Sequence, residues 1–280
     1  MKKWYAVIGD PISHSLSPFM HSKWFAELGL DASYIPIKVK KEQLAQAIIS
    51  LKLLGASGWN VTIPHKEAII QHLDHLDESA KWMGAVNTVV VEVDGSLTGY
   101  NTDGAGFVKS LEESIGLDFR QSSILVIGAG GAARGISFAL KSHGYTDISC
   151  ANRTVESARK LINDINGTRA YSLTEAERNL DDFQILIQTT PAGMKDSGIS
   201  TPLSLEFLKP SAIVADIVYN PLLTPFLIEA KEKRAKIVTG LGMFVHQGSL
   251  SFQKWTTRQA NTERMTRELE QQLGGPNVNR

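Results

Sequence analysis

The stretch SILVIGAGGAARG, residues 123–135, limits the possible folds of this chain more than any other segment. An apolar strand leads into a glycine turn of the pattern G-x-G-x-x-A, over Gly128, Gly130 and Ala133, and small residues fit to begin a helix follow. The glycines allow a tight turn and the close approach of a pyrophosphate, whose charge the amides of the helix N-terminus would bind. Glycine-rich turns also serve packing alone, so the motif needs support from its context.

Short apolar runs alternate with amphipathic stretches on both sides of this turn. Before it, strand and helix patterns alternate, and two further runs flank Asp94-Gly95, a strong hairpin signal, which predicts a mixed sheet within residues 1–103. After it, the runs DISCA, FQILIQ, AIVADIV and KIVTG predict a parallel, Rossmann-type sheet within residues 104–240. Residues 241–280 carry only helical patterns, which we expect to pack back on the first domain.

The predicted fold is therefore two-domain α/β. Residues 1–103, completed by the C-terminal helices of 241–280, form a mixed-sheet substrate-binding domain, and residues 104–240 form a nucleotide-binding domain.

Composition narrows the class of partner. The 280 residues carry 29 basic and 29 acidic side chains and no block of like charge, so we expect a small-molecule substrate and neither nucleic acid nor membrane as a partner. The single cysteine, Cys150, excludes an internal disulfide framework and is typical of a reducing compartment, with the cytoplasm as the default. The start MKKWYAVIGD has too short an apolar run for a signal peptide or a membrane span and is predicted to be the first strand.

The strand after the glycine turn indicates which dinucleotide is bound. It ends in Asn152-Arg153-Thr154, where a dinucleotide fold contacts the adenosine ribose. An NAD enzyme usually carries an acidic residue there, whereas an arginine with two small polar groups favours the 2′-phosphate of NADP. The alternative is a solvated Arg153 with no ligand. Thr189, Thr190, Gly193 and Met194 follow FQILIQ at the carboxyl end of a strand, where open α/β sheets bind ligands.

Polar residues at the ends of elements mark a candidate substrate site in the first domain. Ser17 is predicted to cap a helix that has Pro18 at its first position, and Ser15 with Ser17 could seat a carboxylate. Asp103 could merely cap the helix that begins near Gly104, and Asn87 could be a tolerated polar residue in a strand.

Pro64 also predicts a helix, running through HKEAIIQHL. Lys66 would then lie in its first turn, where the macrodipole disfavours a cation, so the lysine is either solvated or functional.

The motifs SLSP, NVTIPHK, GAVNT, NTDGAGF, GAGGAARG, NRT, TTPAGM, DIVYNP and GMFVHQG cover nearly the whole chain. Their order and approximate spacing resemble those of the shikimate dehydrogenase family, and NVTIPHK with NTDG is more specific than the nucleotide motif. The resemblance implies the reversible reduction of 3-dehydroshikimate to shikimate by NADPH, within chorismate and aromatic amino-acid biosynthesis.

The resemblance also implies roles for individual residues. It places Ser15 and Ser17 on the substrate carboxylate and further polar groups around the ring: Asn60, Thr62, Lys66, Asn87, Asp103, Tyr219 and Gln247. The residues expected to hold NADP are Gly128, Ala129, Gly130, Gly131, Ala132, Asn152, Arg153, Thr154, Thr190, Met194 and Gly240.

Hydride addition to a carbonyl carbon leaves negative charge on the oxygen, which a nearby donor must protonate. Our hypothesis is that Lys66, paired with Asp103, is the general acid in reduction and the base in oxidation. Two alternatives remain: a broader quinate/shikimate dehydrogenase using NAD or NADP, and a catalytically silent NADP-binding sensor. The sequence leaves open whether the protein is a monomer or a homodimer.

His72 and His75, three apart on a predicted helix beside Asp74 and Asp77, have a spacing that could hold a metal. Without a third ligand in an evident motif, a solvated charged face is the better interpretation. We therefore expect no metal.

Overall fold

The structure of the protein is a computed structural model that describes residues 2–195 and 197–274. The chain divides into two compact units: unit 1 contains the residues up to Thr102 and Gln247–Met265, and unit 2 contains Asp103–His246 and the residues from Thr266 on. The first boundary thus lies one residue before the expected one, and residues 241–246 group with unit 2. The assignment of substrate to one domain and cofactor to the other stays a prediction. Residues 275–280 of the predicted first domain lie outside the described residues.

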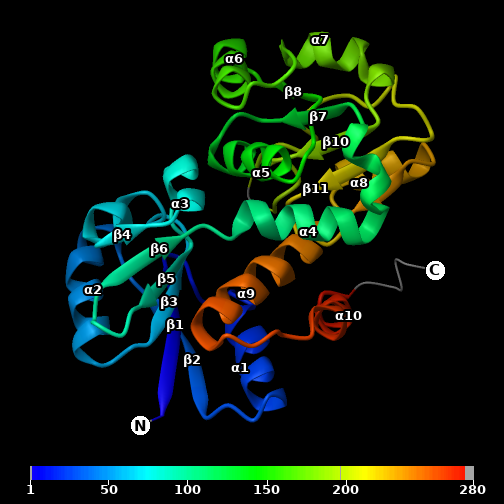
Figure 1. Ribbon diagram of the computed structural model, residues 1–280. Coiled ribbons are helices and arrows are strands. Elements are labelled where there is room, and N and C mark those ends of the chain that lie inside the picture. Colours follow the sequence, from blue (N-terminus) through cyan, green and yellow to red (C-terminus); the bar gives the residue numbers. More distant parts are fainter. Residues whose placement is uncertain (1, 196, 275–280) are drawn as a thin grey trace. The chain divides into compact units, whose positions relative to one another are not determined.

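Unit 1 is built on a mixed sheet of six strands in the order β2-β1-β3-β5-β6-β4 among the described residues (Figure 1). Its strands are β1 (Lys3–Gly9), β2 (Ala32–Lys38), β3 (Gly58–Val61), β4 (His75–Leu76), β5 (Thr88–Val91) and β6 (Leu97–Tyr100). Its helices are α1 (Ser17–Glu27), η1 (Lys41–Gln43), α2 (Leu44–Leu53), η2 (Ala68–His72) and α3 (Glu78–Met83).

The register of this sheet decides which chain ends meet. β1 pairs in parallel with β2 and β3, whereas β5 pairs antiparallel with both β3 and β6. The predicted hairpin at Asp94-Gly95 joins β5 to β6. The carboxyl end of β3 therefore lies beside the amino end of β5, with Asn60 opposite Thr88. Polar residues from both segments are brought to one edge of the sheet.

An aromatic cluster packs the C-terminal part of the chain onto unit 1. Trp255 of α9 (Gly240–Thr256) stacks on Tyr5 of β1 at 4.9 Å between ring centroids, and its indole nitrogen donates to the Val89 carbonyl of β5 at 2.9 Å. The Trp24 indole of α1 donates to the carbonyl of Asn261, just before α10 (Thr262–Gln272). Residues 247–265 thus return to the first domain as predicted, whereas residues 241–246 and 266–274 group with unit 2.

Unit 2 contains a parallel sheet of six strands in the order β12-β11-β10-β7-β8-β9 among the described residues. Its strands are β7 (Ile124–Ile127), β8 (Ile148–Ala151), β9 (Ala170–Tyr171), β10 (Ile185–Gln188), β11 (Ile213–Asp216) and β12 (Lys236–Val238). Its other elements are α4 (Asp103–Ile115), η3 (Leu117–Gln121), α5 (Gly131–Ser142), α6 (Val155–Asp164), α7 (Leu173–Arg178), η4 (Leu180–Asp182) and α8 (Pro225–Glu232).

Helices cover both faces of this parallel sheet, which explains its continuous apolar strands. Successive residues of β7 enter different cores: Ile124 packs in a core shared with α4, α5 and α6, whereas Leu125 packs in a core shared with α7 and α8. The doubly covered sheet confirms the Rossmann-type prediction (Figure 1). The loops that follow β7, β8 and β10 all lie at the carboxyl edge of this sheet, because its strands are parallel.

The helix predicted from Pro64 is wrong. Residues 63–67 form turns, and only the short η2 follows. The Lys66 carbonyl accepts the amide of Val86, from the segment before β5, at 2.7 Å, so it is used outside any helical ladder. The Glu67 carbonyl then accepts from Ile70, a bond of the tighter 3₁₀ type.

Two smaller predictions also differ from the structure. The N-cap of α1 is Leu16 rather than Ser17, and Leu16 makes no side-chain capping bond; the Ser15 hydroxyl accepts from the Ser17 amide at 3.3 Å. His72 ends η2 while His75 lies in β4, so the two histidines share no helix. Within the described part of the chain, no group of three or more metal-ligating side chains occurs.

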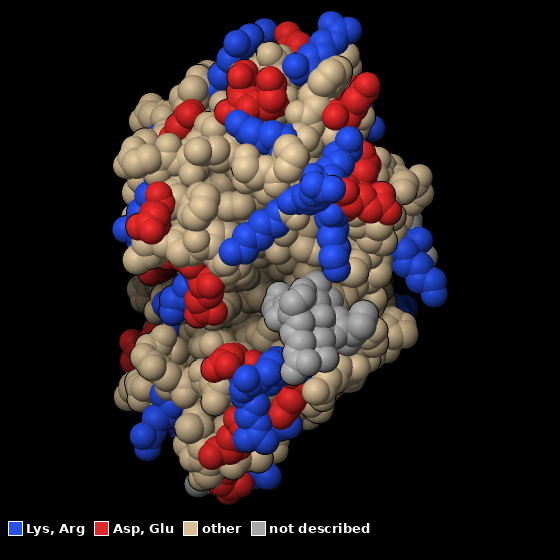
Figure 2. Space-filling view, turned by 90° about the vertical axis from the view of Figure 1, so that its right-hand side faces the viewer, with Lys and Arg blue, Asp and Glu red and all other residues tan. Residues whose placement is uncertain are grey.

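Basic and acidic side chains are interspersed on the face shown in Figure 2, as the equal numbers of the two charge types lead one to expect. Among the described residues, no helix is long and apolar enough to span a membrane.

Candidate active site

The glycine turn of unit 2 has the geometry that a bound pyrophosphate requires. Gly128 has φ of 109°, and a Cβ there would lie 2.6 Å from Thr189 Oγ1, so only glycine fits. Gly130 precedes α5 without a side-chain cap, and a Cβ added at Gly130 or Gly131 would meet nothing within 4 Å. No other group thus crowds Gly130 and Gly131 on their Cβ side, and an uncapped helix N-terminus with such space fits a dinucleotide phosphate.

Asn152, Arg153 and Thr154 lie between β8 and α6, at the carboxyl end of the strand beside β7. Arg153 is exposed and forms no ion pair with another described residue. The Asn152 side chain donates to the Thr154 carbonyl at 3.0 Å, which shapes the turn before α6. An available guanidinium at this position suits a phosphate on the ribose.

The loop that carries Thr190 and Met194 is held by a buried amide that sequence reasoning missed. The Gln188 side chain, fully buried at the end of β10, accepts from the Thr190 amide and donates to the carbonyls of Thr190 at 3.0 Å and Ala192 at 3.1 Å. A backbone amide can only donate and a carbonyl can only accept, so these contacts fix which end of Gln188 is oxygen.

Asp216, at the end of the neighbouring β11, extends this arrangement. Its carboxylate accepts from the Val218 amide at 2.9 Å, the Thr224 hydroxyl at 2.7 Å and, more distantly, Gln188 at 3.4 Å. Burial raises the pKa of Asp216 to about 6, against the lowering effect of the first two of these donors. The motif DIVYNP contained this residue, but nothing in its pattern indicated the role.

Gly240 and Tyr219 lie close to the same end of the unit 2 sheet. A Cβ on Gly240 would meet the Ile217 carbonyl oxygen at 2.4 Å, so close packing alone already requires this glycine. Tyr219 stacks on Phe244 of α9 at 4.7 Å between centroids, and burial raises its pKa. Tyr219 and Asp103 thus belong to unit 2, whereas the other residues predicted to surround the substrate belong to unit 1.

In unit 1 the two serine hydroxyl groups that are predicted to bind a carboxylate are only partly available to a ligand. Ser17 is buried, and its hydroxyl hydrogen-bonds Tyr34, whose own hydroxyl donates to Asn60 Oδ1 at 2.6 Å. Ser15 is half-exposed and accepts from the Ser17 amide. A bound carboxylate would contact Ser15 directly but would compete with Tyr34 for the Ser17 hydroxyl.

The predicted ring-binding amides are joined by direct contacts. Asn60 Nδ2 donates to the Asn87 carbonyl at 3.0 Å, while Asn87 Oδ1 accepts from the Thr102 amide at 3.0 Å. Asn87 Nδ2 in turn faces Gln247 Oε1 of α9 at 3.5 Å. The structure thus brings Ser17, Asn60, Asn87 and Gln247 into one connected set, with Tyr34 and Thr102 as members that sequence reasoning did not single out.

Lys66 is connected to this set by a backbone hydrogen bond, because its carbonyl accepts from Val86, the residue before Asn87. Its turn is fixed by the Val86 amide described above and by His65, whose buried ring Nε2 lies 2.7 Å from the Val39 carbonyl. Lys66 itself is half-buried. Thr62, in the same turn, donates its amide to the Ile8 carbonyl of β1 at 3.0 Å. The turn is therefore tied to three separate segments of unit 1.

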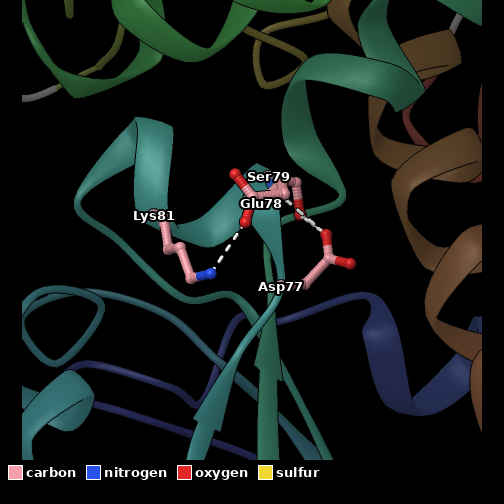
Figure 3. Close-up of polar contacts among 4 residues, drawn as sticks. All are labelled: Asp77, Glu78, Ser79 and Lys81. Carbon is pink, nitrogen blue, oxygen red and sulfur yellow. Dashed lines mark hydrogen bonds and ion pairs between the residues drawn. The ribbon is translucent and has the colours of Figure 1, made fainter.

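The segment that leads to Asp103 is also held on the unit 1 side. Figure 3 shows Asp77 facing Ser79 at the start of α3, where Asp77 Oδ1 accepts from both the amide and the hydroxyl of Ser79, and Glu78 paired with Lys81. The Ser79 hydroxyl then accepts from the Asn101 amide at 3.1 Å. Asp103 follows two residues later as the first residue of α4.

These features define a class: an α/β protein with a dinucleotide site in one unit and, in the other, amide and hydroxyl groups together with a lysine suited to a small polar ligand. Family models agree with this. Residues 7–89 match the shikimate dehydrogenase substrate binding domain, residues 110–195 match shikimate / quinate 5-dehydrogenase, and residues 240–270 match the shikimate 5′-dehydrogenase C-terminal domain.

Individual relatives agree as well. The chain is 57% identical over 275 residues to the shikimate dehydrogenase (NADP(+)) of Lysinibacillus sphaericus, covering 98% of this chain and 100% of the relative. A shikimate 5-dehydrogenase of Thermus thermophilus, solved with NADP(H) and shikimate, superposes with a TM-score of 0.86 at 36% identity, covering 97% and 99% of the two chains. A quinate dehydrogenase of Corynebacterium glutamicum, solved with NAD, gives 0.87 at 27% identity, covering 96% and 99%. The chain belongs to the shikimate dehydrogenase family, which confirms the resemblance found in its motifs.

Proposed function

We propose that this protein catalyses the reversible reduction of 3-dehydroshikimate to shikimate with NADPH. The observation that carries the proposal is the buried, oriented Asn87 side chain between Thr102 and Gln247, whose preceding residue, Val86, anchors the turn of Lys66. Donors and acceptors held rigidly at one edge of a sheet suit a small ring with several hydroxyl groups. The names of the relatives support the same substrate and cofactor.

The residues that fit NADP lie at the ends of β7, β8 and β10. The amides after Gly130 would hold the pyrophosphate, Arg153 would hold the 2′-phosphate, and the loop with Thr190 and Met194 would approach the nicotinamide. When bound, NADPH supplies the hydride for the carbonyl carbon.

The chain's own contribution to the chemistry is proton transfer and orientation. Lys66 protonates the oxygen on which negative charge develops, and it accepts that proton in the reverse direction. Asp103 opposes the lysine charge and orients it, Ser15 and Ser17 hold the substrate carboxylate, and Asn87 and Gln247 bind ring oxygens. Thr62 and Asn60 complete the set of substrate-binding residues. Asn60 contributes chiefly through its hydrogen bonds with Tyr34 and Asn87.

Initial rates of shikimate and quinate oxidation, each with NADP and with NAD, test the proposal through nicotinamide absorbance. Preference for shikimate with NADP is the expected result. Comparable rates with quinate or NAD would replace it with the broader quinate/shikimate activity, and no turnover with any pair would favour the silent sensor. Arg153 is the feature that favours NADP over NAD among these alternatives.

A cytoplasmic location and a monomeric or homodimeric state also stay predictions. The first is supported by the presence of a single cysteine, Cys150, which excludes an internal disulfide. Light scattering of the purified protein would decide the second.

A further inference from the structure

Six polar side chains are buried together in unit 1, none of them more than 7% exposed: Tyr34, Asn60, Asn87, Thr88, Thr102 and Ser251. We call them the Ser251 network. Asn60 and Thr88 lie on the same strands as the fully buried Trp59 of β3 and Val89 of β5. Burying this many polar groups is unfavourable unless each finds a partner, so the arrangement of partners indicates what the network does.

The contacts fix the orientation of the Asn87 amide without ambiguity. The Thr102 backbone amide, which can only donate, lies 3.0 Å from Asn87 Oδ1, and the Thr88 hydroxyl donates to the same atom at 2.8 Å. The backbone donor requires an oxygen there, so the Thr88 hydroxyl must donate to the same atom and the nitrogen of Asn87 points the other way. Nδ2 lies 2.9 Å from Thr102 Oγ1 and 3.5 Å from Gln247 Oε1.

Ser251 connects this amide to α9. Its hydroxyl lies 2.6 Å from Thr88 Oγ1 and 3.1 Å from Asn60 Nδ2, and it can donate to the Gln247 carbonyl at 3.0 Å. Because the Thr88 proton is directed at Asn87, the short Ser251–Thr88 contact requires the serine to be the donor whenever that bond forms. Ser251 thereby holds Thr88 in the orientation that points its proton at Asn87.

We propose that Thr88 and Ser251 are positioning residues that hold the Asn87 amide with its nitrogen toward Gln247, so that a ligand oxygen that takes the place of Gln247 Oε1 is selected as the hydrogen-bond acceptor. The proposal rests on the proposed function, in which Asn87 contacts a ring oxygen of the substrate. A hydroxyl or carbonyl oxygen satisfies this donor, whereas a ligand group that can only donate does not. Neither Thr88 nor Ser251 is required to touch the substrate.

Thr88→Val and Ser251→Ala remove the two hydroxyl groups with little change in volume. Each variant should raise KM for shikimate roughly tenfold, the scale of one unsatisfied or misdirected buried hydrogen bond, and leave KM for NADP unchanged. Thr88→Ser should restore the native value, because it keeps the donor. The double variant should be little worse than either single one, since both act through the same amide.

Thr256→Val is the matched control. Its hydroxyl makes the same kind of bond within α9, to the Phe252 carbonyl at 2.7 Å, but does not contact the network. A KM for shikimate that rises equally in the control, or a KM for NADP that rises in parallel in Thr88→Val, would overturn the proposal.

A second readout separates this proposal from the proposed function. Hydrogen exchange of the Thr102 amide, measured without ligand, reports its bond to Asn87 Oδ1. Faster exchange in Thr88→Val and Ser251→Ala than in Thr256→Val is expected. If the wild-type protein does not turn over shikimate but this exchange pattern holds, the substrate is wrong and the positioning role stands. Unchanged exchange in both variants would overturn the positioning role itself.

Discussion

His21 should make the stability of unit 1 sensitive to acid. Its side chain is fully buried in α1, neither ring nitrogen has a hydrogen-bond partner among the described residues, and burial lowers its pKa from 6.5 to about 3. The imidazole stacks on Tyr34 at 4.4 Å and meets Trp24 edge-on at 5.4 Å between centroids. Its neighbours are therefore aromatic rings that offer a cation no opposite charge.

The sign and size of the effect follow from proton linkage. The unfolded chain binds a proton at this residue below about pH 6.5, whereas the folded chain resists it until about pH 3, so acid favours unfolding between these values. The free energy of unfolding should fall by about 1.4 kcal/mol per pH unit in this range, which amounts to about 2 kcal/mol at pH 5. Above about pH 6.5 the contribution is absent.

Replacing the imidazole isolates this contribution. His21→Phe and His21→Leu differ in packing and will shift the stability at neutral pH by different amounts, but both remove the titrating group. Each variant should therefore gain about 2 kcal/mol relative to the wild type when both are moved from about pH 7.5 to about pH 5. The comparison of two pH values cancels the packing difference and the titration of the carboxylates common to all the proteins.

Tryptophan fluorescence during urea unfolding is a suitable assay, because the two units need not unfold together. The five tryptophans, Trp4, Trp24, Trp59, Trp82 and Trp255, all belong to unit 1, so their emission reports this unit. His75→Gln, which removes an exposed imidazole from the same unit, serves as the control. A wild-type minus variant difference that is the same at both pH values would refute the reasoning.

Three further predictions concern the proposed catalytic lysine, the cofactor and the stability of unit 2. Lys66→Met should lower kcat roughly 10²–10⁴-fold with little change in KM for NADP, and normal steady-state turnover would contradict its role as general acid. Arg153→Ala should raise KM for NADP about 10- to 100-fold but leave KM for NAD unchanged, so an equal loss with both cofactors would remove the assignment to the 2′-phosphate. Because burial raises the pKa of Asp216 to about 6, the folded state holds its proton more tightly than the unfolded chain, and unit 2 should lose stability as pH rises from about 3.8 to about 6. Asp216→Asn should abolish this loss, measured by hydrogen exchange of the β11 amides; an identical pH profile in the two proteins would show that the carboxyl group does not titrate there.

The order of strands and helices could be predicted because both sheets bury apolar residues with a simple period. The parallel strands of unit 2 are apolar on both faces, and Asp94-Gly95 predicts the hairpin of unit 1. Predictions failed where a tertiary contact decides the local structure. Pro64 is a legitimate signal for a helix start, but the Val86 amide takes the Lys66 carbonyl that a helix would need. No local pattern contains that bond.

The candidate site shows the same division. Glycines and charged residues such as Gly128 and Arg153 could be singled out, because few structural roles explain a glycine or an arginine at these points of a strand–turn–helix unit. Thr88 and Ser251 could not, because a small hydroxyl residue in a strand or a helix is compatible with almost any environment. Their importance depends on partners 163 positions apart in the chain.

Both units use a backbone amide to fix the orientation of a buried side-chain amide. In unit 1 a backbone amide, that of Thr102, fixes the oxygen of Asn87, and in unit 2 the amide of Thr190 fixes the oxygen of Gln188. In each case a buried side-chain amide at the end of a strand is oriented by main-chain groups that cannot exchange their roles as donor and acceptor. Such an amide cannot rotate without leaving two buried groups unsatisfied, so it holds its neighbouring loop in one geometry before any ligand arrives. We therefore expect that substitutions of buried polar residues behind the proposed ligand-binding ones alter KM without touching a ligand.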